Sequence, residues 1–476
     1  MPQRKPTQRK SRPQKQRYGS STPPSIGPSL GTNGRATHAK NGNRKPKKVR
    51  SANGSLEAES HSNTLLTRRG FLYGALGVGA VAVVGAGAAA AVAITDSQEE
   101  EEEITVLEVP ETEVTNIDEF GNAEKSNDHV SLVQSINLPF GSLVWANSSS
   151  IAACLLPTEE SASPLTQAAI LSLTSGDYSV VLEQAVGQED GYDIYDIRAN
   201  TNGIVWTEAN IFRNTWRIYA ATYNEGSMGE PILLDEGDNE WETPTLVASA
   251  TSAFWQVLPS LSGTHTAEDS LLKRARFGSA NVETIYSSTG RMSTPPYGLE
   301  NRVVITPRTN TSRVHHQLTL LDSESGDVLD KVVLPAGMKP LEAGYTDNGF
   351  TFSFEGSYDY GEGIADMGTY TPMAAATPQN YNGLEWFHFA RVPSAAPAWC
   401  GKYLIVKSLT SVIGVDLASN TYFAIDVETG SETYGDYLAT TGIHDRFVTY
   451  TGVDYKPLKG SAQHYCLVRV WEPISE

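Results

Sequence analysis

A repeat of about 50 residues runs from about residue 130 to the C-terminus and constrains the fold of this chain. Its members are short runs rich in Val, Ile, Phe, Tyr and Trp, which Gly, Asn, Asp and Pro interrupt. No long helical period accompanies them, so the pattern indicates an all-β fold. The seven most apolar runs recur at intervals of 43 to 53 residues. They begin at Ile151, Ile204, Ala253, Arg302, Phe350, Tyr403 and Arg446.

Turn residues repeat with the same period. The segments Asp322–Gly326 and Asp426–Gly430 are near copies of each other, and Ser172–Gly176 is similar to both. The glycine supplies a positive φ, and the Asp or Ser side chain can close the turn. With weaker members at Gly226 and Gly278, neighbouring turns lie 48 to 52 residues apart, and the last two lie 104 residues apart, which is two periods.

These two sets of repeats predict a seven-bladed β-propeller, with four strands in each blade, over residues 130–476. The next turn would fall beyond the C-terminus, so the last blade, from about residue 442, lacks an outer strand. Residues 130–137 have strand character, and we expect them to fill this place and close the ring. The repeat resembles that of WD40-like and TolB-like propellers over about 345 residues. This resemblance is architectural and implies no function, because the chain has no Trp-Asp dipeptide and no Asp-box.

Charge divides the chain into two unlike parts. Residues 1–69 hold 16 Lys and Arg and two acids, whereas the remainder holds 20 basic residues and 53 acids. Few apolar side chains accompany the basic residues, so we predict that residues 1–66 form a disordered cytoplasmic tail. Such a tail can lie near anionic lipid. Nucleic-acid binding through phosphate contacts is the alternative. We do not expect it, because Tyr18 is the only aromatic residue of the tail.

The run Thr67–Leu72 reads TRRGFL. It resembles the twin-arginine (Tat) signal consensus Ser/Thr-Arg-Arg-x-Phe-Leu-Lys, with Tyr73 in place of the usual Lys. The resemblance covers only these residues. It implies a bacterial protein that engages the Tat translocase transiently and is exported in a folded state; an ordinary membrane span with two flanking arginines is the alternative. The residues assigned to the export signal are Arg68, Arg69, Phe71 and Leu72.

An uncharged stretch without proline, Phe71 to Ile94, is long enough to cross a membrane as a helix. We therefore assign residues 67–94 to a signal or transmembrane helix and the acidic, turn-rich residues 95–129 to a stalk. If the helix is kept, the chain is a single-pass protein of the cell membrane with the propeller outside. Cleavage at a small-residue pattern such as Ala88–Ala90 would make it a secreted protein.

Propellers commonly bind ligands in the central channel or on the loops that join second to third strands. In the predicted propeller, these loops place seven residues on a candidate ligand face: Arg213, Trp216, Arg313, Tyr358, Asp359, Glu362 and Asp366. The last four combine an aromatic ring with three carboxylates, a mixture that can bind a sugar or a cation. A solvated acidic loop is the alternative.

Other conspicuous residues favour structural roles. Trp206 and Trp255 occupy equivalent repeat positions, which indicates packing between blades rather than ligand stacking. Adjacent histidines in an extended chain, His315 and His316, point to opposite sides. The acids from Asp235 to Glu240 lack the spacing of a calcium loop. We therefore predict no metal site.

The remaining sequence features contain no motif of a known catalytic or cofactor-binding site. Three cysteines exclude a disulfide framework and iron–sulfur clusters. No nucleophile elbow, P-loop, dinucleotide fingerprint or zinc-protease motif is present, so no catalytic residue and no cofactor is predicted. Our hypothesis is an exported, non-enzymatic binding module for a protein, peptide or glycan. A carbohydrate-active hydrolase or lyase using Asp359, Glu362 or Asp366 is the alternative, and a cofactor-carrying enzyme is third.

Overall fold

The computed structural model describes residues 106, 114–116, 123–158, 167–224, 226–311, 313–346, 349–354, 386–388, 395–408, 411–416, 418–431 and 435–474. The predicted tail, residues 1–66, and the predicted membrane helix, residues 67–94, lie outside them. Within the described ranges, no helix combines the length and the apolar character that crossing a bilayer requires.

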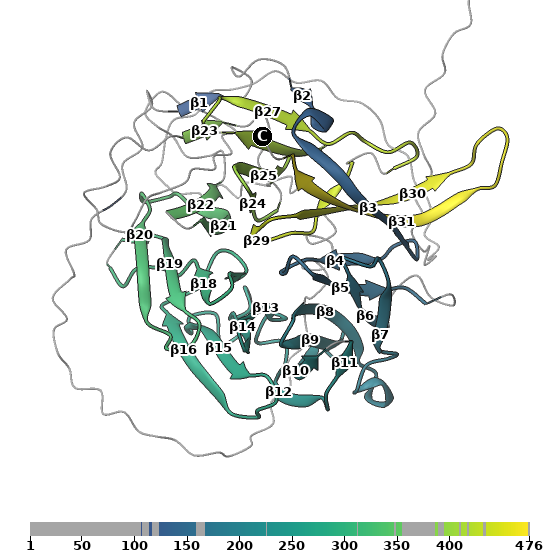
Figure 1. Cartoon of the computed structure of the whole chain (residues 1–476). Coiled ribbons are helices and arrows are strands. Elements are labelled where there is room, and N and C mark those ends of the chain that lie inside the picture. The colour runs from purple at the N-terminus through teal and green to yellow at the C-terminus, as the bar shows by residue number, and fades with distance from the viewer. Residues whose placement is uncertain are drawn as a thin grey trace, which may run out of the picture. The chain divides into compact units, whose positions relative to one another are not determined.

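Antiparallel sheets of consecutive strands follow one another along the chain and around a ring (Figure 1). The first sheet contains β4 (Leu143–Trp145), β5 (Ile151–Leu156), β6 (Gln167–Ser172) and β7 (Tyr178–Leu182). The second contains β8 (Asp193–Asn200), β9 (Gly203–Asn210), β10 (Thr215–Asn224), β11 (Ser227–Met228) and β12 (Ile232–Gly237). The third contains β13 (Thr245–Ser249), β14 (Ser252–Val257), β15 (Ser270–Arg276) and β16 (Val282–Ser288).

The ring continues with four more sheets in the described residues. The fourth contains β17 (Tyr297–Gly298), β18 (Arg302–Ile305), β19 (Gln317–Asp322) and β20 (Val328–Val333). The fifth is described by β21 (Pro340–Thr346) and β22 (Gly349–Phe354). The sixth is built on β24 (Ala398–Cys400), β25 (Tyr403–Lys407), β26 (Val412–Asp416) and β27 (Thr421–Ala424). The seventh contains β28 (Tyr437–Leu438), β30 (Phe447–Tyr455), β31 (Gln463–Pro473) and β3 (Val130–Leu138).

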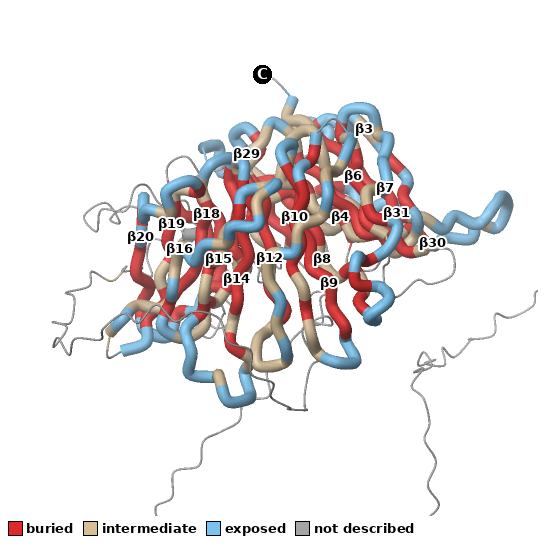
Figure 2. Tube along the Cα trace, turned by 90° about the horizontal axis from the view of Figure 1, so that it is seen from below, coloured by how far each residue is buried: buried red, intermediate tan, exposed pale blue. Residues whose placement is uncertain are grey.

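The seven apolar runs of the sequence all form second strands, counted from the ring centre. A second strand has a neighbouring strand on each side and a neighbouring sheet on each face, so both of its faces are covered. This explains the continuous apolar runs. In β9, β14 and β22 every residue is buried. Figure 2 shows the same pattern, with buried strand centres between exposed loops at both ends of the sheets. Successive radial sheets of this kind form a β-propeller.

Ring closure uses an N-terminal strand, as the sequence predicts. Strand β3 pairs antiparallel with β31, from Val130 opposite Pro473 to Leu138 opposite Cys466. The register of this strand pair shifts between Leu132 and Gln134. The seventh sheet thus receives its outer strand from the other end of the domain, and β31 has no free edge along this stretch.

Part of the segment predicted as a stalk also pairs with the domain. Val106 forms a parallel bridge with Val333 at the end of β20. Strand β1 (Val114–Asn116) pairs parallel with β23 (Trp386–His388), and β2 (Glu124–Lys125) pairs parallel with β27. We call these three stretches the rim segment. Their pairing replaces the expected free stalk over these residues.

The predicted glycine turns are correct in four sheets. Gly176, Gly226, Gly278 and Gly326 have φ between 78° and 88° and lie between third and fourth strands. Gly430 also has a positive φ, of 86°, but the predicted place of its turn in the sheet is wrong, because residues 426–430 follow the fourth strand, β27.

The equivalent turn of the sixth sheet is Asp416–Asn420. Asn420 takes the left-handed conformation with φ of 54°. Asp416 Oδ1 accepts hydrogen bonds from the backbone N–H groups of Ala418 and Ser419. Asp322 accepts in the same way from Glu324 and Ser325. Asn adopts this conformation more readily than most residues other than Gly. Asn420 therefore takes the place in this turn that a glycine takes in the other four.

Adjacent sheets share apolar cores that include both repeat tryptophans. Trp206 is fully buried and packs with Leu155 and Ile170 of the first sheet. Trp255 is fully buried and packs with residues of the second sheet, including Ile218. The predicted role in packing between blades is confirmed for both.

Candidate functional site

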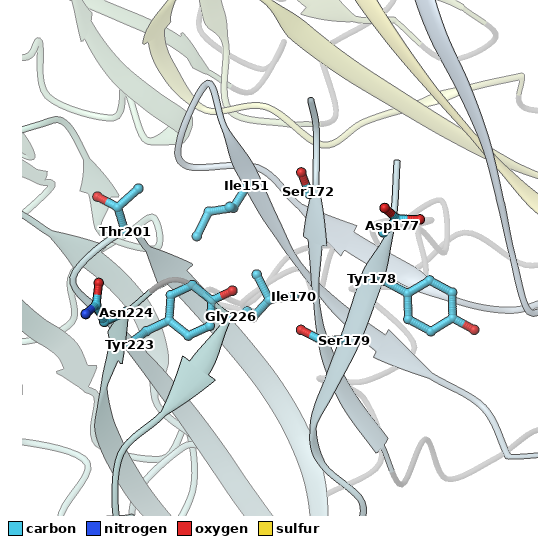
Figure 3. Close-up of a pocket in the computed structure, with 10 residues that line it drawn as sticks. All are labelled: Ile151, Ile170, Ser172, Asp177, Tyr178, Ser179, Thr201, Tyr223, Asn224 and Gly226. Atoms are coloured by element: carbon cyan, nitrogen blue, oxygen red, sulfur yellow. The ribbon is translucent and has the colours of Figure 1, made fainter. Parts of the chain in front are cut away.

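A cleft of about 490 Å³ opens between the outer parts of the first and second sheets (Figure 3). Its walls come from β5, β6 and β7 on one side and from the end of β10 and the turn after it on the other. This volume lies within the range of about 300–1,000 Å³ that is usual for small-molecule sites. The lining residues are Ile151, Ile170, Ser172, Asp177, Tyr178, Ser179, Thr201, Tyr223, Asn224 and Gly226.

The cleft lies at the end of the sheets opposite to the predicted ligand face. Thr201 follows a first strand, and Asp177 and Gly226 lie in turns between third and fourth strands. In an antiparallel sheet these connections share one end, whereas loops between second and third strands lie at the other. The cleft was therefore not predicted, because the loops expected to bind a ligand lie at the opposite end of the sheets.

The turn that carries Asp177 is held by its own backbone. The N–H of Ser172 donates to the Asp177 carbonyl at 2.8 Å, and the N–H of Gly176 donates to the Ser172 carbonyl at 2.9 Å. The Asp177 N–H donates to Ser175 Oγ at 3.3 Å. These bonds occupy main-chain groups and leave the Asp177 side chain exposed at the cleft.

Tyr223 supplies the aromatic wall. Its side chain is 9% exposed and lies among the other lining residues in Figure 3. Burial raises the pKa of Tyr223 above its usual value, although hydrogen bonds with the Gly226 backbone and the Ser179 side chain oppose the rise. The hydroxyl is therefore neutral at pH 7. The ring of Tyr178, in contrast, points away from the other side chains drawn in Figure 3.

The lining combines polar groups with a larger apolar surface and carries no cation among the residues described. It presents four hydroxyl groups, one amide and one carboxylate, together with the apolar faces of Ile151 and Ile170, and the Tyr178 hydroxyl faces elsewhere. Hydroxyl and amide groups can both donate and accept hydrogen bonds. The arrangement suits an uncharged ligand that has both hydrogen-bonding groups and apolar surface.

The structure describes three of the seven predicted ligand-face residues, Arg213, Trp216 and Arg313. Arg213 and Arg313 are exposed on loops between second and third strands, as expected. Tyr358, Asp359, Glu362 and Asp366 lie outside the described residues.

The prediction for Trp216 is wrong. Its side chain is 3% exposed and packs with Trp255 and Leu246. It lies across from Gly237 in the neighbouring strand β12. A Cβ atom at Gly237 would lie 2.2 Å from the Trp216 ring, so the absence of a side chain there makes room for the indole. Trp216 cannot stack on a ligand at the loop face.

The other polar residues singled out in the sequence are held by protein partners. His315 Nδ1 lies 2.9 Å from the Leu334 carbonyl, and His316 Nδ1 lies 2.9 Å from Ser293 Oγ. Asp235 Oδ2 accepts from Trp255 Nε1 at 2.7 Å and from Lys273 Nζ at 2.8 Å. Glu240 accepts from the N–H of Thr264 at 2.8 Å. Each group stabilises a loop or a strand pair.

The ring centre holds a second, smaller cavity of about 40 Å³. Its lining includes Trp145, Arg198, Tyr297 and Glu342. The Arg198 guanidinium carbon lies 4.5 Å from the centre of the Trp145 ring. Tyr297 Oη donates to the Pro397 carbonyl at 2.8 Å and accepts from the Gly442 N–H at 2.7 Å, linking three parts of the ring. A cavity of this size has room for a few water molecules and not for a sugar ring.

Comparison with known proteins gives no family. No family model matches the chain, and no curated protein matches it. Similar solved structures include a prolyl endopeptidase, with 10% identity, a TM-score of 0.43 and coverage of 67% of this chain and 46% of that chain. A puromycin-hydrolyzing peptidase of Mycobacterium tuberculosis has 10% identity, a TM-score of 0.40 and coverage of 67% and 53%.

The β-propeller domain of the Trilobed protease from Pyrococcus furiosus, described with an open velcro topology, is a third. It has 10% identity and a TM-score of 0.37, and the match covers 57% of this chain and 82% of that domain. The chain spans about half the length of the two peptidases. The fold assignment rests on the strand pairing of this chain.

Proposed function

We propose that this chain is an exported β-propeller that acts as a binding module and takes a glycan in the cleft between its first and second sheets. The observation that carries the proposal is the lining of the cleft. Sugar hydroxyls donate and accept hydrogen bonds at once, as do the side chains of Thr201, Ser179 and Asn224. The apolar surfaces of Ile151 and Ile170 can cover the C–H groups of a sugar ring.

The binding module has seven blades in this proposal. Seven second strands, from β5 to β30, support this count. Six of the corresponding sheets contain four or more strands among the described residues, and the fifth contains two. Residues 355–385 follow the second strand of that sheet directly and supply enough chain for further strands.

A hydrolase is less well supported by the described residues. Glycosidases of the common type use two carboxyl groups, about 5–9.5 Å apart, on either side of the scissile bond. The cleft lining contains one, that of Asp177. We therefore retain binding as the function and assign no catalytic residue.

Export is the remaining part of the proposal. The Tat-like run around Arg68 and Arg69, followed by the uncharged residues to Ile94, supports passage of the folded domain across the membrane. The expected location is the cell membrane, with the propeller outside, or the medium if the helix is removed.

A glycan array probed with the full purified chain tests the binding function. We expect binding to neutral glycans, and Asp177→Asn together with Asn224→Ala should weaken it roughly tenfold or more through lost hydrogen bonds. Asp327→Asn is the matched control. Asp327 directly follows the turn glycine of the fourth sheet, and Asp177 holds the same position in the first sheet. The backbone carbonyl of each accepts a hydrogen bond from the N–H of the residue that begins its turn, Asp322 or Ser172. Absence of glycan binding, or equal loss in the control, would refute the proposal.

A further inference from the structure

Three loops bring basic side chains together at the end of the sheets opposite to the cleft. Arg308 and His316 lie in the loop between β18 and β19, where they form an antiparallel bridge. Ser293 lies between the third and fourth sheets, and Lys339 precedes β21. We call these four residues the basic cluster.

Neighbouring groups fix the geometry of the basic cluster. His316 is 8% exposed, and its Nδ1 lies 2.9 Å from Ser293 Oγ. The His316 carbonyl accepts from the Leu334 N–H at 2.8 Å. The backbone N–H of Arg308 donates to Ser288 Oγ at 3.0 Å. The backbone on both sides of the bridge is therefore held in place.

The Arg308 side chain lies against a glycine. A Cβ atom at Gly290 would lie 3.0 Å from Arg308 Nη1, so the guanidinium packs directly on the main chain there. The Nε atom of Arg308 is buried and has no hydrogen-bond partner in the part of the chain that the structure describes. A buried donor without a partner is costly, and an anion bound beside Arg308 would supply the acceptor.

Charge in the basic cluster is unbalanced. Neither Arg308 nor Lys339 forms an ion pair with a carboxylate among the described residues. Basic side chains of the neighbouring third sheet, such as Lys273 and Arg274, each pair with an acid. Burial, followed by the positive charges of Arg308 and Lys339, lowers the pKa of His316 to about 4. His316 is therefore neutral at pH 7 and lies in a positive local field.

We propose that the basic cluster binds an oxyanion, such as a phosphate or sulfate group. Arg308 supplies a planar, fixed set of N–H donors, and Lys339 supplies a mobile point charge. When His316 carries its proton on Nδ1 and donates it to Ser293 Oγ, the Ser293 hydroxyl is a third donor. The anion satisfies Arg308 and offsets the excess positive charge. This site is separate from the cleft, so it does not depend on the proposed glycan binding.

Calorimetric titration of the full chain with inorganic phosphate and with sulfate, at constant ionic strength set by chloride, tests the proposal. We expect saturable binding that chloride does not reproduce. Arg308→Gln and Lys339→Gln together should weaken it roughly tenfold or more, as expected for the loss of charge-assisted hydrogen bonds. A sugar phosphate and a sugar sulfate form a second arm, which distinguishes an ester-linked group from the free ion.

Lys459→Gln is the control, because Lys459 is exposed on the β30–β31 hairpin and has no ion pair among the described residues. If Arg308→Gln does not fold, the single variant Lys339→Gln still tests the proposal. Lys339 is exposed, so we expect this variant to fold. The proposal is overturned if phosphate and sulfate bind no better than chloride, or if Lys339→Gln and Lys459→Gln change binding equally.

Discussion

The Trp206 indole N–H donates to Glu208 Oε1 at 3.1 Å, and both side chains are fully buried in the second sheet. The same carboxylate accepts from the backbone N–H groups of Val186 at 2.6 Å and Gly187 at 2.8 Å. Glu208 thus fixes the loop that leads from the first sheet to the second. These two sheets form the walls of the cleft.

Glu208→Gln should lower the free energy of unfolding by about 1–3 kcal/mol, because an amide N–H₂ would face N–H donors that now meet a carboxylate oxygen. Urea denaturation measures the change. Glu230→Gln, at an exposed position, should alter it by less than about 0.5 kcal/mol. Equal midpoints for the two variants would show that the buried carboxylate is not needed to fix the loop.

Acid should destabilise the domain partly through His316. Its pKa is about 4 in the folded chain, below the ordinary histidine value of about 6.5 expected in the unfolded chain, so the unfolded state binds the proton more tightly. The stabilisation is therefore complete above pH 6.5 and is lost as the pH falls through 4. Urea denaturation at pH 7.5 and pH 4.5 should show a smaller pH effect in His316→Gln than in the wild type. An identical pH effect would contradict the assignment; His464→Gln, at an exposed site, is the control.

Export should depend on the paired arginines. Arg68→Lys together with Arg69→Lys should keep the chain inside the cell, because the signal resembles the Tat consensus and the helix that follows is weakly apolar, with nine Ala and five Gly between Phe71 and Ile94. Fractionation and surface protease digestion measure the distribution. Normal surface display of the double variant would favour an ordinary membrane span.

The sequence predicted the second strands well, since burial on both faces leaves a continuous apolar run. Residues 151–156 and 403–407 are examples. The ring-closing strand was also predictable, because counting turns left the last sheet one strand short. The turn at Asp416–Asn420 was missed, since Asn420 replaces glycine with φ of 54°.

Parallel pairing of the rim segment was not predictable. Val106 and β1 form backbone hydrogen bonds with strands far along the chain. Backbone hydrogen bonds require no particular side chains, so the order of residue types in the sequence does not reveal them. The cleft was missed for a related reason. Its lining joins turns of two sheets, and proximity between Asp177 and Asn224 depends on how adjacent sheets pack.

The pairing of β3 with β31 closes the ring, and a cysteine pair across these two strands tests this closure most directly. Ser131 and Glu472 lie opposite each other and are accessible, so Ser131→Cys with Glu472→Cys has the spacing of a disulfide. We predict that mild oxidation joins the two introduced cysteines within one chain, as peptide mass spectrometry can show, and raises the melting temperature. Val133→Cys with Glu472→Cys, out of register by two residues, should cross-link poorly. Equal cross-linking of the two pairs, or cross-links only between chains, would contradict the closed ring.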